Sequence, residues 1–548
     1  MPAAVSLFRR RSFLAKAAAV VALVALADFL FFLQEPGWTI GLFALAWTVA
    51  LAVAVPAVRH HRAAIVALAA AFADACLLAD DPGPIKWLLF WIALSLAAML
   101  PGRRFDDAWQ WALRLFIHGV STAYAPIADL VRLSRLQRPP ARFGAGALLR
   151  LAALPILGSL VFLSLFAAAN PLIENALAAI RLPSLDAETI VRAIFWTFIL
   201  FMTWPAFRPR AVATGLSLEG GHGLVPPAST AVVTLSLAAF NLVFALQNGL
   251  DLIFLWSGAP LPEGMTLAAY AHRGAYPLIA TALLAGLFVL VTLRPGSETA
   301  QRPIVRRLVV LWVGQNVLLV ASSILRTIDY VDAYSLTVLR LAALAWMALV
   351  AVGLMLICWR LLLERSAAWL INANALAAAI VLSAGVTIDL GSVAAEWNVR
   401  HAREVDGTGA EIDLCYLNQL GPSALVPLAW FETRIGNPAL LERVRYVRGR
   451  IVGDMRRRQA DWRQWTWRDD RRLAAAEATL GDAPPRARVA RWGRDCNGRP
   501  LRPPPPIQVA REAAPKADVP SPPVAPNDLP SATPGEPPAA PLTPGAER

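Results

Sequence analysis

The chain has 548 residues, of which 57% are hydrophobic and only 16% are charged. Because a soluble domain carries roughly a quarter charged residues, this composition excludes an ordinary soluble protein. The formal net charge is +13, and nearly all of it lies between or after long apolar runs. The sequence therefore indicates a multipass membrane protein with a polar C-terminal tail.

Eleven apolar segments are long enough to cross a membrane as a helix, which takes about 20 mostly apolar residues. The first follows three arginines, as a signal peptide does, but its apolar run is too long and contains Lys16 and Asp28. We therefore expect an all-α polytopic membrane helix bundle. Its expected spans are 13–33, 37–57, 62–79, 84–100, 147–169, 189–207, 229–256, 275–293, 307–326, 336–358 and 367–390.

Lys and Arg in the short loops predict which end of each span faces the cytoplasm. If the N-terminus is cytoplasmic, the inner loops carry 20 of these residues and the outer loops carry only Lys86, Arg181, Arg273 and Arg326. The odd number of spans then places the C-terminal region outside. Long translocated segments are largely exempt from the rule, so the basic C-terminal region does not oppose this topology.

The expected spans divide the chain into five parts that differ in composition. They are a four-span N-terminal membrane module (1–100), a basic cytoplasmic loop (101–145), a seven-span membrane core (146–390), an extracytoplasmic helical region (391–499) and a disordered Pro-rich tail (500–548). The tail holds 16 of the chain's 42 prolines, a composition that does not build a packed core.

The basic cytoplasmic loop contains one amphipathic segment. Trp109, Leu113, Phe116 and Val120 recur at helical spacing, with charged residues on the opposite face. This pattern and the flanking arginines predict a helix lying in the inner membrane interface. A helix that faces the solvent is the alternative.

The stretch 434–472 is strongly basic, with twelve arginines, five acids and the three tryptophans Trp462, Trp465 and Trp467. Outside the cytoplasm it is not a nucleic-acid site, but it suits anionic lipid, envelope polymers or an acidic protein partner. A solvated helix face laced with salt bridges is the other interpretation. The oligomeric state does not follow from the sequence.

The cysteines and motifs point to no recognisable chemistry. Cys415 and Cys496 both lie in the predicted outer region, where an oxidising compartment allows a disulfide, but spacing alone does not establish one. Cys76 and Cys358 lie inside expected spans, where we expect them to be small packing residues. The sequence lacks metal-ligand spacing, a P-loop, a dinucleotide fingerprint and the HExxH and GxSxG motifs. We therefore expect no metal, no cofactor and no motif-defined catalytic residue.

Ionisable residues at membrane depth cost about 2.5–3.5 kcal/mol each on insertion scales and are functional candidates for that reason. Several fall near the expected outer ends of the later spans and in the loops between them. They form either an outward-facing polar cavity for an anionic or hydroxylated ligand, or salt bridges that fix the helix register, with Asp251 or Asp389 paired with Arg326 or Arg340. The candidates are Asp251, Tyr270, His272, Arg273, Arg326, Asp329, Tyr330, Asp332, Arg340 and Asp389.

A second set of polar residues lies deeper in the membrane. Gln315, Asn316 and Ser323 belong to a polar stripe on the ninth span that should face the bundle interior. Asn372 and Asn374 lie at a similar depth to the two amides on the last span. Amides hydrogen-bond between helices at about 0.6 kcal/mol each, and we favour this role over a permeation path.

Three blocks in the second half carry a family resemblance. They are QNGLDLIFLWSGAPLPEGMTLAAYAHRG, QNVLLVASSILRTIDYVDAYSLTVLRLAALAWM and DLGSVAAEWNVRHAREVDGTGAEIDLCYLNQLGPSAL. In this order they resemble the bacterial multipass membrane proteins grouped as domain of unknown function 4173, with its relative 4153, over roughly residues 145–430. The resemblance implies a multipass protein of the bacterial cytoplasmic membrane, and it supplies no activity.

Three functions fit these observations. The first is a non-catalytic scaffold or envelope-associated membrane protein, which the lack of chemical motifs and the large C-terminal region favour. The second is a transporter or lipid-handling protein, which the polar stripe favours and the lack of an internal repeat opposes. The third is a membrane enzyme at the outer face, with Asp251, His272 and Asp332 as acid–base groups.

Overall fold

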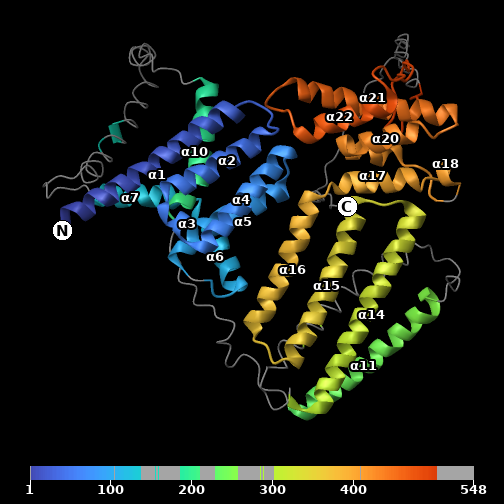
Figure 1. Ribbon diagram of the computed structural model, residues 1–548, viewed down its shortest axis with the longest axis horizontal. Coiled ribbons are helices and arrows are strands. Elements are labelled where there is room, and N and C mark those ends of the chain that lie inside the picture. Colours follow the sequence, from blue (N-terminus) through green and yellow to red (C-terminus); the bar gives the residue numbers. More distant parts are fainter. Residues whose placement is uncertain are drawn as a thin grey trace, which may run out of the picture. The chain divides into compact units, whose positions relative to one another are not determined.

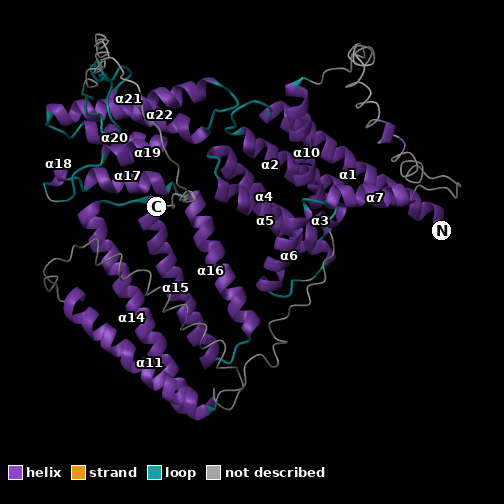
Figure 2. Cartoon of the chain, turned by 180° about the vertical axis from the view of Figure 1, so that it is seen from behind, coloured by secondary structure: helices purple, strands orange, loops and turns teal. Residues whose placement is uncertain are grey.

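The computed structural model is helical throughout its described part (Figures 1 and 2). No strand occurs in that part, and eight of its helices are long and apolar enough to cross a membrane. This confirms the predicted all-α polytopic bundle. The structure describes residues 2–103, 105–136, 155, 158–159, 186–209, 229–256, 284, 288, 301–407 and 409–502. The expected spans 147–169 and 275–293 lie almost wholly outside these residues, as does the Pro-rich tail from 503 onward.

The first bundle packs around the large buried side chains Phe43, Trp47 and Phe90. Its helices approach closely because small residues line their contacts: a Cβ added to Gly41 would lie 2.3 Å from the backbone nitrogen of Ala79. The sequence grouped 189–207 with the later spans, but this helix packs here, against the first, second and fifth helices. The members are α1 (Pro2–Phe31), α2 (Thr39–Ala54), the short α3 (Pro56–His60), α4 (Arg62–Asp80), α5 (Pro84–Met99) with a 3₁₀ turn η1 (Leu100–Gly102), and α10 (Ala187–Phe207).

The second bundle has its own apolar core, which includes Trp312, Met347 and Leu354. Its longest helix continues eight residues past the expected span end at 326, because no helix-breaking residue interrupts the segment up to Tyr334. The members are α11 (Thr230–Asp251), continued by a π-helical turn η3 (Leu252–Trp256), α14 (Pro303–Tyr334), α15 (Val338–Leu362) and α16 (Ala367–Thr387).

Helices α11 and α14 run parallel, because the residue numbers rise together along their contact. The amide of Asn241 donates to the Leu308 carbonyl over 3.0 Å, and the amide of Asn248 donates to the Gln315 carbonyl over 3.2 Å. Parallel packing is what the predicted topology gives for the seventh and ninth spans, with one span between them in the sequence.

The basic loop folds into α6 (Ala108–Ser121) and α7 (Ala125–Leu136). In α6 the usual pattern is inverted, because apolar Trp109 and Phe116 are 45% and 69% exposed while Arg114 and His118 are buried. Burial lowers the pKa of His118 from 6.5 to about 4. An outward apolar face over a buried polar face is the arrangement expected of a helix in a membrane interface.

The C-terminal region has a separate core, formed by residues such as Leu417, Phe431 and Val447. Side chains cap its helices locally: Asn437 accepts from the first turn of α21, and Thr466 accepts from the Asp469 amide at the start of α22. Its elements are α17 (Leu390–Arg400), α18 (Arg403–Asp406), α19 (Leu414–Leu420), η4 (Gly421–Ala424), α20 (Leu425–Glu432), α21 (Pro438–Ala460) and α22 (Trp467–Leu480).

Candidate functional site

The C-terminal region contacts the membrane helices at their ends, and we call this contact the seam. In the first bundle, the Gly37 amide donates to the Arg463 carbonyl over 2.8 Å. The approach is so close that a Cβ on Gly37 would lie 2.3 Å from the Gln464 carbonyl oxygen, so only glycine fits. In the second bundle, the Leu336 amide donates to the Asn398 side chain over 2.6 Å.

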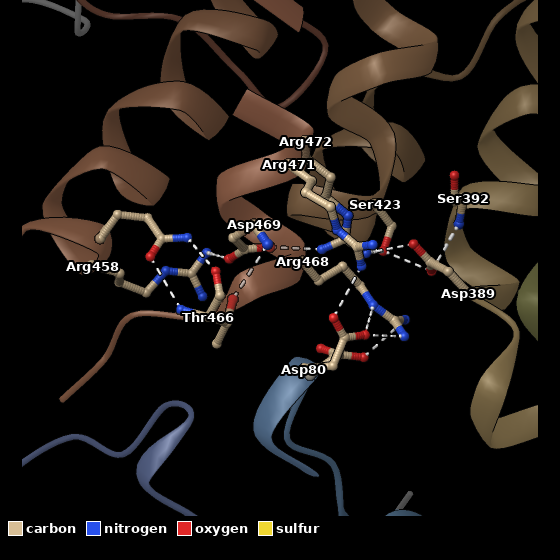
Figure 3. Close-up of polar contacts among 12 residues, drawn as sticks. Asp80, Asp389, Ser392, Ser423, Arg458, Thr466, Arg468, Asp469, Arg471 and Arg472 are labelled. Carbon is tan, nitrogen blue, oxygen red and sulfur yellow. Dashed lines mark hydrogen bonds and ion pairs between the residues drawn. The ribbon is translucent and has the colours of Figure 1, made fainter. Parts of the chain in front are cut away.

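Arginines at the start of α22 bind the carboxylates that end α4 (Figure 3). The Arg468 guanidinium lies 2.7 Å from Asp80 and 3.3 Å from Asp81, and Arg471 lies 3.1 Å from Asp80. Lys86 of α5 also pairs with Asp81 over 2.8 Å. The Arg468 side chain is largely buried, so this is a partly desolvated network and not a loose surface pair.

One turn further along α22, Arg472 pairs with Asp389, which lies two residues beyond α16 and caps the start of α17 (Figure 3). Arg472 also lies 2.7 Å from Asp469, and the Ser423 hydroxyl donates to Asp389 over 3.0 Å. Burial raises the pKa of Asp389, but the hydrogen bond and charge of Arg472 outweigh it, so the net shift is downward. Asp389 therefore stays ionised, and this ion pair joins α22 to the second bundle.

Helix α22 is thus bonded to both bundles within four residues of its sequence. Sequence reasoning placed Asp389 with Arg326 or Arg340, whereas its partner is Arg472, which lies 83 residues further along the chain. Several arginines of the basic stretch 434–472 form salt bridges, some within the C-terminal region and some with carboxylates at the span ends.

A second polar site lies between α11 and α14. Asp251 and Arg326 form one of the pairings that the sequence left open, and their side chains are only 3% and 7% exposed. Gln247 donates to the same carboxylate over 3.0 Å, and the Trp256 indole donates to the Ser322 hydroxyl over 3.2 Å. The pair is therefore fully enclosed, and each charge depends on the other.

Along α11 and α14, several buried side-chain oxygens accept no hydrogen bond in the described part of the chain. They belong to the side chains of Asn241, Asn248, Asp251, Gln315 and Asn316. An unsatisfied buried acceptor costs about 1–3 kcal/mol, so a row of them is chemically suited to a donor-rich guest such as water. Sequence reasoning missed Asn241, although its seven-residue spacing from Asn248 on an apolar span was a usable signal.

The other outer candidates that the structure describes do not join that site. The Arg340 guanidinium donates to the Tyr334 carbonyl over 2.7 Å and lies 4.2 Å from the Tyr330 ring centre, closing the turn between α14 and α15. Asp329 is exposed, and Asp332 lines a separate cavity of about 310 Å³. The remaining candidates lie outside the described residues: Tyr270, His272 and Arg273.

The deeper amides do not form one layer. Asn316 and Ser323 bond to carbonyls of their own helix, over 2.8 and 2.9 Å. Asn372 accepts from the Ala108 amide over 2.7 Å and so caps α6, while Asn374 bonds to the Leu370 carbonyl over 2.9 Å. The last span therefore uses one of its amides to fix the interfacial helix.

The cysteines are used in two ways. Cys415 and Cys496 form a disulfide with their Cα atoms 4.7 Å apart, which fastens the end of the C-terminal region to α19. Cys76 and Cys358 are free thiols on membrane helices. In the part of the chain that the structure describes, no group of three His, Cys, Asp or Glu residues could hold a metal ion.

Comparison with known proteins identifies the family. The family described as Domain of unknown function (DUF4153) matches residues 62–430. The chain belongs to this family. Separately, 71 residues are 39% identical to NADH-quinone oxidoreductase subunit N of Deinococcus radiodurans, a stretch that is 12% of this chain and 14% of that protein. No solved structure matches the chain. DUF4153 membership and the eight apolar helices of the described residues indicate a membrane protein.

Proposed function

We propose that this DUF4153 protein is a non-catalytic scaffold of the bacterial inner membrane, related also to domain of unknown function 4173. Its N-terminus lies in the cytoplasm and its C-terminal region outside. The distribution of Lys and Arg among the loops supports this orientation. The Cys415–Cys496 disulfide supports it independently, because such bonds persist in oxidising compartments.

The observation that carries the proposal is the double attachment of α22. Arg468 binds the first bundle through Asp80, and Arg472 binds Asp389, which follows the last helix of the second bundle by two residues. Two bundles with separate apolar cores are thereby held to one outer region. A device that fixes membrane modules under a folded outer surface suits a platform for envelope partners.

A charge swap tests this proposal. Asp80→Arg and Arg468→Asp should each loosen the seam, and the combined variant should restore it, because the opposite charges meet again. Hydrogen exchange of the backbone over 462–472 in the purified protein reports the seam, and complementation of a deletion strain reports function. Arg457→Asp is the matched control, since Arg457 is 80% exposed and, among the described residues, pairs with Asp454 of its own helix and not with a membrane helix.

If the proposal is right, complementation follows the protection of the 462–472 backbone from hydrogen exchange in all four variants: the two single charge swaps, their combination and the control. If the single variants open the seam and complementation remains at the wild-type level, holding the two bundles together is not what the cell needs. A combined variant that stays open as well would show that the two residues do not act as a pair.

The enclosed polar site favours a second function, a transporter or lipid-handling protein. Its support is the Asp251–Arg326 pair beside the unsatisfied oxygens of Asn248 and Asn316. If this alternative is right, Asn248→Leu and Asn316→Leu leave folded protein in the membrane but abolish complementation of the deletion strain. Retained function in both variants would exclude it.

A further inference from the structure

A groove runs along the C-terminal region between α21, α22 and the segment 482–487 that follows. Its volume is about 790 Å³, within the range of ligand pockets. One wall consists of α21 residues that lie three and four positions apart and so share a face of the helix. The second half of α22 forms the other wall. Leu473, Ala476 and Leu480 give the α22 wall an apolar surface.

Two glycines make the α21 wall unusually bare. Gly449 and Gly453 lie one turn apart in the middle of a 23-residue helix, and a Cβ added to either would meet nothing within 4 Å. Packing within the chain therefore does not require them, although glycine is less favourable than alanine in a helix. Glycines in such positions permit close approach of another backbone.

The rim of the groove is positively charged. Five arginines and two acids line it. Buried Glu432 holds two of the arginines in place, with Arg445 at 3.0 Å and Arg448 at 2.7 Å. In the described part of the chain, Arg450 and Arg486 have no ion-pair partner and are exposed. The groove thus combines a fixed basic edge with two free guanidinium groups.

We propose that this groove binds an acidic amphipathic helix of a partner protein, an inference that rests on the proposed scaffold function and names its partner class. The apolar wall accepts the apolar face of such a helix, the glycines allow its backbone to approach, and the arginines pair with its carboxylates. A lipid headgroup fits less well, because α21 packs on α19, α20 and α22, on the side away from α14–α16 (Figures 1 and 2).

The test measures binding of a labelled synthetic peptide to the full-length protein in nanodiscs by fluorescence polarisation. The probe is a helix of about three heptads with Leu at the core positions and Glu elsewhere, and a matched peptide carries Gln for every Glu. Gly453→Leu fills the groove and Arg486→Glu reverses its free charge. Arg457→Glu is the matched control, because Arg457 lies on the same helix but lines a neighbouring cavity and not this groove.

We expect the Glu peptide to bind, and the Gln peptide, Gly453→Leu and Arg486→Glu each to weaken binding about tenfold or more. Gly453→Ala should raise the unfolding temperature, because its Cβ meets open space, and still weaken binding. Arg457→Glu should leave binding within about twofold. A tenfold loss of affinity corresponds to about 1.4 kcal/mol of binding free energy.

Three results would overturn the inference: no binding of the Glu peptide, equal loss with Arg457→Glu, or full binding by Gly453→Leu. Polyphosphate is a further probe. If it binds as tightly as the Glu peptide and Gly453→Leu does not weaken its binding, the surface is a general polyanion site and the inference is also refuted. Failure here with a protected seam leaves the scaffold proposal standing. Wild-type complementation by single charge-swap variants whose seam is open, together with intact peptide binding, would refute the scaffold proposal and leave the groove as a binding site.

Discussion

The enclosed pair of Asp251 and Arg326 gives the sharpest prediction about stability. Both side chains are almost fully buried, and removing one partner of a buried pair costs about 3–5 kcal/mol because the other charge stays without compensation. Asp251→Asn removes the carboxylate charge that faces the Arg326 guanidinium, and Arg326→Gln removes the positive charge that faces the Asp251 carboxylate. Replacing both removes both charges, so the double variant should lose less stability than either single variant.

Equilibrium unfolding of the purified protein in detergent, with the two single variants and the double variant, measures this coupling. We expect the double variant to recover most of the loss, with the same order in the amount of folded protein in the membrane. Additive losses would refute the reasoning, because they would mean that the two charges are stabilised separately. Single variants that stay at wild-type stability but fail to complement a deletion strain would make the pair a ligand site instead.

Three further predictions concern regions outside the spans. Burial lowers the pKa of His118 from its ordinary value of 6.5 to about 4 in the folded protein. As the pH falls from 7 toward 4, His118 therefore gains a proton in the unfolded state but not in the folded state. The free energy of unfolding should drop by about 3 kcal/mol over this range. Thermal unfolding against pH should show this drop in the wild type and not in His118→Phe, and equal slopes would contradict it. Reducing the Cys415–Cys496 disulfide should lower the free energy of unfolding by about 2–5 kcal/mol, and a Cys415→Ser variant should not respond to reductant. An unfolding temperature of the wild type that reductant leaves unchanged would disprove this. Asp389→Asn should raise hydrogen exchange at the start of α22, because Asp389 loses its charge-assisted bond, whereas Asp454→Asn, which removes only an exposed pair, should leave that exchange unchanged.

Hydropathy predicted most membrane helices well, because length and apolar content are properties of one segment. The expected span 62–79 is helix Arg62–Asp80, and 84–100 is helix Pro84–Met99. Helix neighbours are a property of two segments, and no pattern in a single chain specifies them. That is why 189–207 was grouped with the later spans, although it packs with the first bundle.

The same limit applies to the charged residues. Their presence at span ends was visible in the sequence, and the Asp251–Arg326 pairing was among the alternatives. The partner of Asp389 was not, because Arg472 lies in a stretch of twelve arginines with nothing to distinguish one from another. Only the fold, which sets the start of α22 against the ends of α4 and α16, selects Arg468 and Arg472 from that stretch.

Because the C-terminal region serves both as a seam and as a candidate binding surface, deleting it cannot separate the two roles. A chain cut near residue 430 loses Arg468 and Arg472, so the carboxylates at the span ends lose their partners, and it also loses the half of the disulfide that Cys496 supplies. Such a chain would fail whether or not a partner exists. Arg486 lies in the groove and makes no seam contact among the described residues. Loss of function in Arg486→Glu with the exchange of 462–472 unchanged would therefore assign the role to the groove, and retained function would assign it to the seam.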